Sequence, residues 1–179
     1  MVMVILVGIP CAGKDTWLNG PHSNLGNYYH YSPDAELERL ALRDGITYQK
    51  AWEAYNEWVY TDYEDSMKEE IKNITDRHVV INKTNLTKTS RARYLNLMPN
   101  INKVAVVFRT PVDIALARSR ERQQRPPLYK HVPPAVIEKM VERLEIPTYD
   151  EGFETIFDYN GSQLIQHQRP VKRMHKENA

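Results

Sequence analysis

A glycine-rich turn near the N-terminus constrains the fold of this chain more than any other feature. Residues 8–16 read Gly-Ile-Pro-Cys-Ala-Gly-Lys-Asp-Thr and directly follow an apolar, β-branched run at residues 2–7. Glycines at both ends let the backbone curl with its N–H groups pointing inward, and the lysine adds a full positive charge. A strand that leads through such a turn into a helix is typical of nucleoside triphosphate binding. The residues predicted to hold the phosphates are Gly8, Pro10, Cys11, Ala12, Gly13, Lys14, Asp15 and Thr16.

The rest of the chain alternates short β-like runs with segments of helical periodicity. The expected strands are residues 2–7, 27–31, 78–82, 103–108 and about 154–158. The expected helices beyond the turn are residues 34–43, 48 to about 73, 87–98, 111–125 and 133–145. This alternation predicts an α/β fold with a mostly parallel sheet of about five strands flanked by helices. We expect the domain to span residues 1–160 and a basic, polar tail to follow at residues 161–179.

Composition excludes several classes of protein. The chain has 24 Lys and Arg against 23 Asp and Glu, so any polyanion site must be a local cluster of charge. The single cysteine, Cys11, excludes an intramolecular disulfide framework and a multi-cysteine zinc site. The N-terminal apolar run is too short to cross a bilayer and lacks a basic flank. We therefore expect a cytoplasmic protein that makes no membrane contact.

Three later stretches, taken with the turn, carry a resemblance to a known family. They are His-Tyr-Ser-Pro-Asp at residues 30–34, Val-Val-Ile-Asn-Lys-Thr-Asn-Leu at residues 79–86, and the arginine-rich residues 118–132. In order and spacing they resemble the 5′-kinase domain of phage polynucleotide kinases and related small P-loop kinases. The resemblance implies transfer of the γ-phosphoryl group of ATP, carried with Mg²⁺, to a hydroxyl on a nucleic acid. It also places the protein in the host cytoplasm if a phage encodes it.

Asp34 is the candidate general base. It lies just beyond the second expected strand, at the same edge of a parallel sheet as the phosphate-binding turn. A kinase needs a carboxylate there to orient a hydroxyl and to accept its proton. The resemblance assigns this role to Asp34, although Ser32-Pro33-Asp34 also reads as an ordinary helix start. Lys14 is expected to neutralise charge on the transferred group.

Three arginines predict a helical lid over the phosphates. Arg118, Arg122 and Arg125 recur at i, i+4 and i+7 and so share one helical face. Guanidinium groups on such a face can meet the oxygens that gain charge during phosphoryl transfer, whereas a solvated charged face is the alternative. The resemblance assigns Arg118 and Arg122 to the nucleotide phosphates and the transition state. Arg125 would stack on the base or hold the lid.

Two positions depart from the family at the expected metal site. The residue after Lys14 is normally Ser or Thr, whose hydroxyl binds Mg²⁺, but here it is Asp15. The third strand normally ends near an Asp, but here it ends at Asn82. We predict that Asp15 has taken over the metal-side carboxylate and that Asn82 binds through its carbonyl or a water. The alternative is that the helix dipole favours Asp15 in a first turn.

The acceptor side leaves four functions open. Where the family has an Arg three residues after the catalytic Asp, this chain has Leu37. A 5′-hydroxyl of DNA or RNA follows most directly from the resemblance, and Leu37 favours a hydroxymethyl group on a modified base of the 5-hydroxymethyluracil type. A nucleoside, a nucleotide or another small molecule is the third acceptor. A non-catalytic nucleotide-binding switch would instead explain the changes at Asp15 and Asn82.

Aromatic residues gather between positions 48 and 63. Tyr48, Trp52 and Tyr55 fall on one helical stripe, which predicts that they face the core. Tyr60 and Tyr63 lie off that stripe and are better candidates for stacking on the bases of a single strand.

Overall fold

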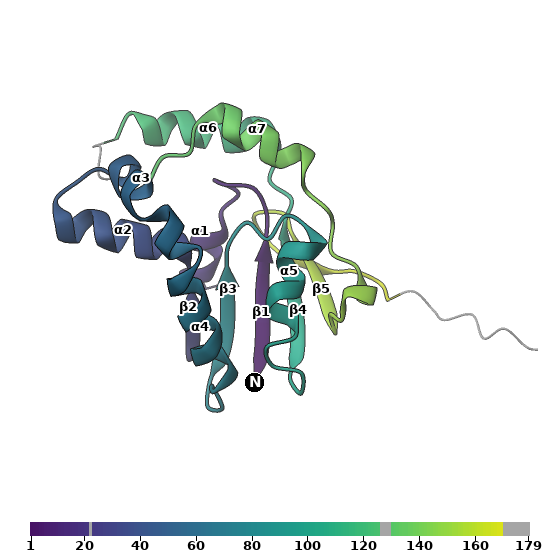
Figure 1. Cartoon of the computed structure of the whole chain (residues 1–179). Helices are drawn as coiled ribbons and strands as arrows, with labels where there is room; N and C mark the ends of the chain where they lie inside the picture. The colour runs from purple at the N-terminus through teal and green to yellow at the C-terminus, as the bar shows by residue number, and fades with distance from the viewer. Residues whose placement is uncertain (22, 126–129, 170–179) are drawn as a thin grey trace, which may run out of the picture.

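A computed structural model describes residues 1–21, 23–125 and 130–169, and a six-stranded sheet runs through its centre (Figure 1). The strands are β1 (Val2–Val7), β2 (Tyr28–Tyr31), β3 (His78–Asn82), β4 (Asn102–Phe108), β5 (Thr155–Tyr159) and β6 (Leu164–Gln166). Their order is β2-β3-β1-β4-β5-β6, and the neighbours among the first five strands are parallel. The predicted α/β fold with a mostly parallel sheet is therefore confirmed.

The sixth strand was not predicted. β6 pairs antiparallel with β5 and lies beyond residue 160, where the predicted domain ends. All of its residues are exposed, so it carries no apolar alternation from which a strand could be predicted.

Helices cover both faces of the sheet (Figure 1). They are α1 (Lys14–Leu18), α2 (Pro33–Asp44), α3 (Tyr48–Val59), α4 (Asp62–Lys72), α5 (Lys88–Leu95), α6 (Val112–Gln123) and α7 (Pro134–Glu142), with a 3₁₀ turn η1 (Tyr149–Glu151). The helix expected from residue 48 to about 73 is divided into α3 and α4. The division falls at Thr61, whose φ of −126° and ψ of −92° lie outside the helical region. None of the helices in the described ranges has the length and apolar character needed to span a membrane.

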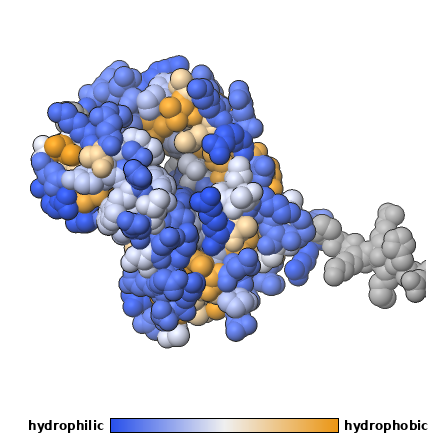
Figure 2. All heavy atoms as spheres, viewed as in Figure 1, coloured by the Kyte–Doolittle hydropathy of each residue, from blue (hydrophilic) through white to orange (hydrophobic). Residues whose placement is uncertain are grey.

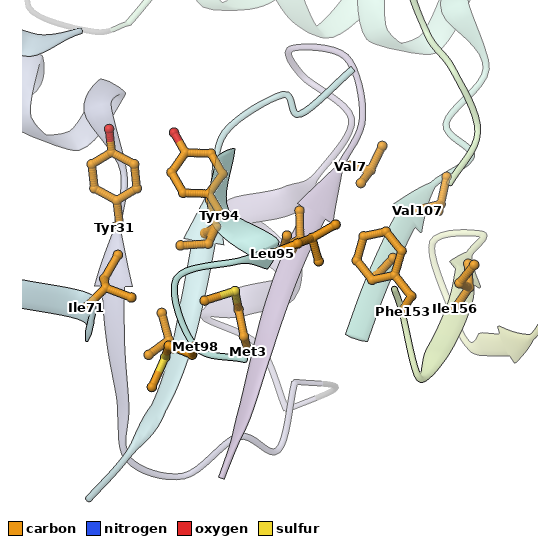
Figure 3. Packing of buried hydrophobic residues seen from close by; sticks show 14 of the residues in the cluster. Met3, Val7, Tyr31, Ile71, Tyr94, Leu95, Met98, Val107, Phe153 and Ile156 are labelled. Carbon is orange, nitrogen blue, oxygen red and sulfur yellow. The ribbon is translucent and has the colours of Figure 1, made fainter. Parts of the chain in front are cut away.

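Two apolar layers hold the sheet between the helices. Met3, Ile5 and Val7 of β1 face one layer, which includes Tyr31, Tyr94 and Phe153 among its buried members (Figure 3). The alternate residues Val4 and Leu6 face the other layer, which includes Trp17, Phe108 and Ile137. β1 is thus buried on both faces, as its continuous apolar run predicts. Figure 2 shows that hydrophilic side chains cover most of the face viewed there, with apolar patches between them.

A buried arginine ties the segments that follow β3 to the end of the domain. Arg91 of α5 has no exposed surface and donates from Nη1 to the carbonyls of Asn85 at 3.0 Å and of Glu145 at 2.9 Å. Its Nε and Nη2 donate to the Glu151 carboxylate, each at 2.7 Å. These contacts join α5, the turn before it and η1, so they hold the segment that follows β3 in place.

Candidate active site

The glycine-rich turn lies against the ends of β3 and β4, the two strands that flank β1. The Gly8 N–H donates to the Thr84 carbonyl at 3.0 Å, just beyond β3. A Cβ at Gly8 would lie 3.0 Å from the Cβ of Phe108, so a larger residue here would crowd the end of β4. Gly13 has a φ of 95°, which curls the turn as predicted, and the second residue with positive φ is Cys11, at 62°, rather than Gly8. Because the Gly8 N–H is engaged by Thr84, Gly8 shapes the turn and presents no donor to a phosphate.

The Lys14 side chain folds back onto the backbone of the turn. Its Nζ donates to the carbonyls of Gly8 and Ile9, at 2.9 Å each. Burial and then the nearby positive charge of Lys130 lower the pKa of Lys14 to about 8. The ammonium group is therefore held against the backbone of the turn.

Asp34 faces the turn from the first helical turn of α2. Ser32 is the N-cap of that helix and accepts a hydrogen bond from the Ala35 N–H at 3.3 Å. The helix start therefore does not need the Asp34 carboxylate. Its Oδ1 accepts from the Tyr48 hydroxyl at 3.1 Å, and its Oδ2 accepts from Lys130 Nζ. Asp34 is thus available for chemistry rather than occupied as a cap.

The surroundings of Asp34 keep its carboxyl group ionised. Burial alone raises the pKa of Asp34, but the charge of Lys130 and its hydrogen bond outweigh that effect. Lys14 and the Tyr48 hydroxyl act in the same direction, so the pKa lies below its usual value. A carboxylate in this state accepts hydrogen bonds only, which is what an incoming hydroxyl requires.

One cavity of about 430 Å³ joins the turn to Asp34. On the turn side it is lined by Pro10, Cys11, Ala12, Gly13, Lys14, Asp15 and Thr16. The rest of its lining includes Asp34, Glu38, Tyr48, Trp52, Tyr60, Arg122 and Lys130. The structure therefore brings the predicted phosphate-binding residues, apart from Gly8, together with the predicted base.

The two residues predicted to hold a metal ion are in contact. Asn82 Nδ2 donates to Asp15 Oδ1 at 2.7 Å, and both residues line the cavity. Turning the Asn82 amide over would present its oxygen at the same place, so the donor chemistry fits Mg²⁺. In the described ranges no three His, Cys, Asp or Glu side chains are grouped to hold a metal ion, so amide or phosphate oxygens would complete the set. Lys83 turns away to Glu64 and the Tyr94 hydroxyl, at 3.0 and 2.7 Å.

The lid arginines divide between two cavities that share the turn. A second cavity of about 360 Å³ is lined by Thr110, Arg118, Arg125 and Tyr159 beside residues of the turn. Arg118 Nη1 donates to the Cys11 carbonyl at 3.0 Å and so lies against the turn.

Arg122 lines both cavities. Arg125 Nη2 donates to Glu121 at 3.0 Å. α6 lies across the carboxyl ends of the strands in Figure 1.

Sequence reasoning missed part of the acceptor side. Tyr48 packs among buried Leu37 and Val59 as expected, yet its hydroxyl reaches Asp34. Trp52, assigned to the core stripe, is 38% exposed and lines the cavity with Tyr60. The Trp52 and Tyr60 ring centroids are 5.7 Å apart.

Tyr63 does not line this cavity. Its ring centroid is 6.2 Å from that of Tyr31 and 5.4 Å from that of Trp58. Tyr60 is therefore the one of the two proposed stacking residues that is placed to meet a ligand there.

Lys130 and Glu38 also reach the cavity. A basic segment around Lys130 was visible in the sequence, but nothing there indicated its partner Asp34.

Comparison with known proteins agrees with this geometry. A family model described as an AAA domain matches residues 3–147. A search of curated proteins finds no match.

Several solved structures share the fold. Kti12 from Chaetomium thermophilum, in complex with ADP-AlF3, is 16% identical over 89% of both chains, with a TM-score of 0.61. A gluconokinase from Sinorhizobium meliloti 1021 is 13% identical over 87% of this chain and 81% of its own, with a TM-score of 0.50. A chain of the Pnkp1/Rnl/Hen1 RNA repair complex is 21% identical over 80% of this chain and 43% of its own, with a TM-score of 0.53. These likenesses show a P-loop kinase-like fold.

Proposed function

Because this chain belongs to the AAA domain family and has a P-loop kinase-like fold, we propose that it phosphorylates a hydroxyl group on a polynucleotide, with ATP as donor. The observation that carries the proposal is the position of Asp34. An ionised carboxylate, held by Lys130 and the Tyr48 hydroxyl, shares one cavity with Lys14 and the phosphate-binding turn. Binding of a nucleotide alone would need no proton acceptor there.

The residues divide the reaction between them. Asp34 orients the acceptor hydroxyl and takes its proton as the acceptor oxygen bonds to the γ-phosphorus. The bond from that phosphorus to the β–γ bridging oxygen breaks, and ADP leaves. Lys14 and Arg122, which both line the cavity, stabilise the charge that gathers on the phosphoryl oxygens. Mg²⁺, held by Asp15 and Asn82, would supply further neutralisation of the phosphates.

Two features support a nucleic acid as the acceptor. Trp52 and Tyr60 both line the cavity, with ring centroids 5.7 Å apart, and a base can stack on either ring. Such stacking contributes about 1–3 kcal/mol per base. Arg122 and Lys130 also line the cavity and bring positive charge to it, on a chain of net charge +1. A 5′-hydroxyl is the first acceptor to test.

A hydroxymethyl group on a base within DNA is the second candidate, and two residues of α2 favour it. In the phage polynucleotide kinases that the sequence resembles, the position of Leu37 carries an Arg that binds the acceptor. Leu37 is fully buried, so it cannot reach a strand phosphate. The next residue, Glu38, lines the cavity and offers that phosphate no positive charge. A base turned out of the helix would bring its hydroxyl to Asp34 and leave its own phosphate outside.

Transfer from ATP labelled in the γ-phosphate tests both candidates. The acceptors are a 5′-hydroxyl oligonucleotide, its 5′-phosphorylated form, 5′-blocked DNA with hydroxymethyluracil, and small alcohols such as gluconate. Label in the first alone supports the 5′-kinase, and label in the blocked DNA supports the base kinase. Label in a small alcohol alone would mean that the acceptor is a metabolite and not a polynucleotide. Tight ATP binding with no transfer to any acceptor contradicts the kinase and supports a switch.

A further inference from the structure

His30 brings a nitrogen atom to the two residues expected to hold the metal ion. His30 belongs to β2, Asn82 ends β3, and Asp15 lies in α1, so three elements meet at one point. Asn82 Nδ2 is 2.7 Å from Asp15 Oδ1 and 3.1 Å from His30 Nε2. Only the amide nitrogen of Asn82 can face an ionised carboxylate at that distance, because two oxygens without a proton would repel.

The orientation of Asn82 determines that of the imidazole lone pair. An amide NH₂ group has two hydrogens and accepts no hydrogen bond, so it donates one hydrogen to each neighbour. His30 Nε2 is then an acceptor, and its lone pair points toward the same amide group as the Asp15 carboxylate. Asp15 and His30 are both exposed and both line the cavity that contains the turn. The amide group lies between them, so a cation bound beside it would meet all three side chains.

We propose that Asp15, Asn82 and His30 together form a divalent-cation site, and that the His30 nitrogen makes this site prefer Mn²⁺ to Mg²⁺. Rotation of the Asn82 amide brings its oxygen inward and completes a set of two oxygens and one nitrogen. Mg²⁺ prefers oxygen ligands in a near-ideal octahedron, whereas imidazole suits transition metals. Mn²⁺ accepts carboxylate and carbonyl oxygens as readily as Mg²⁺ does. As a transition-metal ion it also bonds to nitrogen, which Mg²⁺ does not favour. The inference rests on the proposed function only in that a nucleotide supplies the remaining ligands.

The proposal accounts for both departures from the family pattern at once. A carboxylate at residue 15 replaces the usual hydroxyl, and the amide of Asn82 replaces the usual carboxylate. The total charge of the protein ligands is thereby unchanged, while His30 adds a neutral donor from the next strand of the sheet. The neighbouring cation Lys83 is bonded to Glu64 and does not compete for the site.

Electron paramagnetic resonance of Mn²⁺ bound to the full chain with a non-hydrolysable ATP analogue tests the assignment. We expect nuclear modulation from a directly bound nitrogen, which changes to the ¹⁵N pattern when the histidines carry ¹⁵N. His30→Ala should remove this signal and weaken Mn²⁺ binding by about tenfold. His167→Ala, which removes an imidazole paired with Asp158 of β5, is the matched control and should leave both unchanged. His30→Asp should retain a bound metal, lose the nitrogen signal and shift the preference toward Mg²⁺.

Three results would overturn the inference. The first is a wild-type spectrum without nitrogen modulation, and the second is a nitrogen signal that persists in His30→Ala. The third is a ratio of Mn²⁺ to Mg²⁺ affinity that is the same in His30→Asp as in the wild type. Thermal unfolding of each variant shows whether it is folded. No acceptor is present in these measurements, so a failure of phosphoryl transfer would contradict the proposed function without affecting this result.

Discussion

Two ion pairs in this molecule join similar groups in opposite surroundings. The Arg91 and Glu151 side chains are 0% and 2% exposed, and Arg91 also donates to backbone carbonyls. The Lys130 and Asp34 side chains are 18% and 32% exposed and line the cavity beside the phosphate-binding turn. The first pair is enclosed by protein and maintains the fold, whereas the second is open to substrates and keeps a carboxylate charged. The buried pair therefore stabilises the fold, and the pair in the cavity keeps the proposed general base ionised.

The largest effect should come from removing the charge of the cavity pair. Asp34→Asn keeps the size of the side chain but cannot accept the proton, so we expect phosphoryl transfer to fall by about 10²–10⁴-fold. Because Ser32 caps α2, the free energy of unfolding should change little. Initial rates with the responsive acceptor, alongside urea unfolding, measure both. Asp76→Asn, on the exposed Asp76–Arg77 pair, is the control. Transfer by Asp34→Asn at the wild-type rate would contradict the assignment of Asp34 as base.

The enclosed pair should show the reverse pattern. Arg91→Met leaves the Glu151 carboxylate buried and unpaired, and breaking such a pair costs about 3–5 kcal/mol of unfolding free energy. Transfer per folded molecule should remain, because Arg91 lies outside the cavity. Arg93→Met, at an exposed position of the same helix, is the matched control and should cost far less. Equal losses in the two variants would show that the enclosure of Arg91 does not matter.

A smaller effect should follow from removing Lys130. Its charge holds the pKa of Asp34 low against burial, so Lys130→Met should raise that pKa. Transfer requires ionised Asp34, and the acid side of the pH–rate profile should therefore move to higher pH. Lys130→Arg keeps the charge and should leave the profile close to that of the wild type. If the acid limb of the profile does not move in Lys130→Met, Lys130 does not control the pKa of Asp34.

The smallest effect concerns Lys14. With a pKa of about 8, its ammonium group is charged below that pH and loses its proton above it. ATP binding should weaken by about threefold between about pH 7.5 and about pH 8.5 if only the charged form binds. Titration calorimetry with an ATP analogue over this range measures the change. In Lys130→Met the decline should move to higher pH, because the repelling charge is gone. An affinity independent of pH up to 10 would contradict the lowered pKa.

The sequence indicated the sheet and the catalytic edge because both depend on local patterns. Continuous apolar runs marked β1, β3 and β4, and parallel strands bring their carboxyl ends to one edge. The sequence therefore predicts that Asp34 and the turn face one another. The proposed roles of these residues in phosphoryl transfer stay predictions.

Features that depend on distant partners could not be predicted in the same way. Arg91 bonds to residues as far away as Glu151, and Lys130 bonds to Asp34 across 96 positions. No spacing in the sequence records such pairs. The break at Thr61 involves neither Gly nor Pro, and the periodic pattern continues across it. β6 is short and wholly exposed, so hydrophobic periodicity could not indicate it.

The hydrogen bonds from Lys14 to the carbonyls of Gly8 and Ile9 have a consequence for nucleotide affinity. A free lysine side chain has about 2 kcal/mol of rotamer entropy. Here most of that freedom is lost when the chain folds, because the ammonium group is already fixed before any phosphate arrives. Binding then exchanges carbonyl partners for phosphate oxygens and requires little further ordering of this side chain. The turn is thus preorganised, because the entropy cost of ordering Lys14 is met when the chain folds and not when phosphate binds.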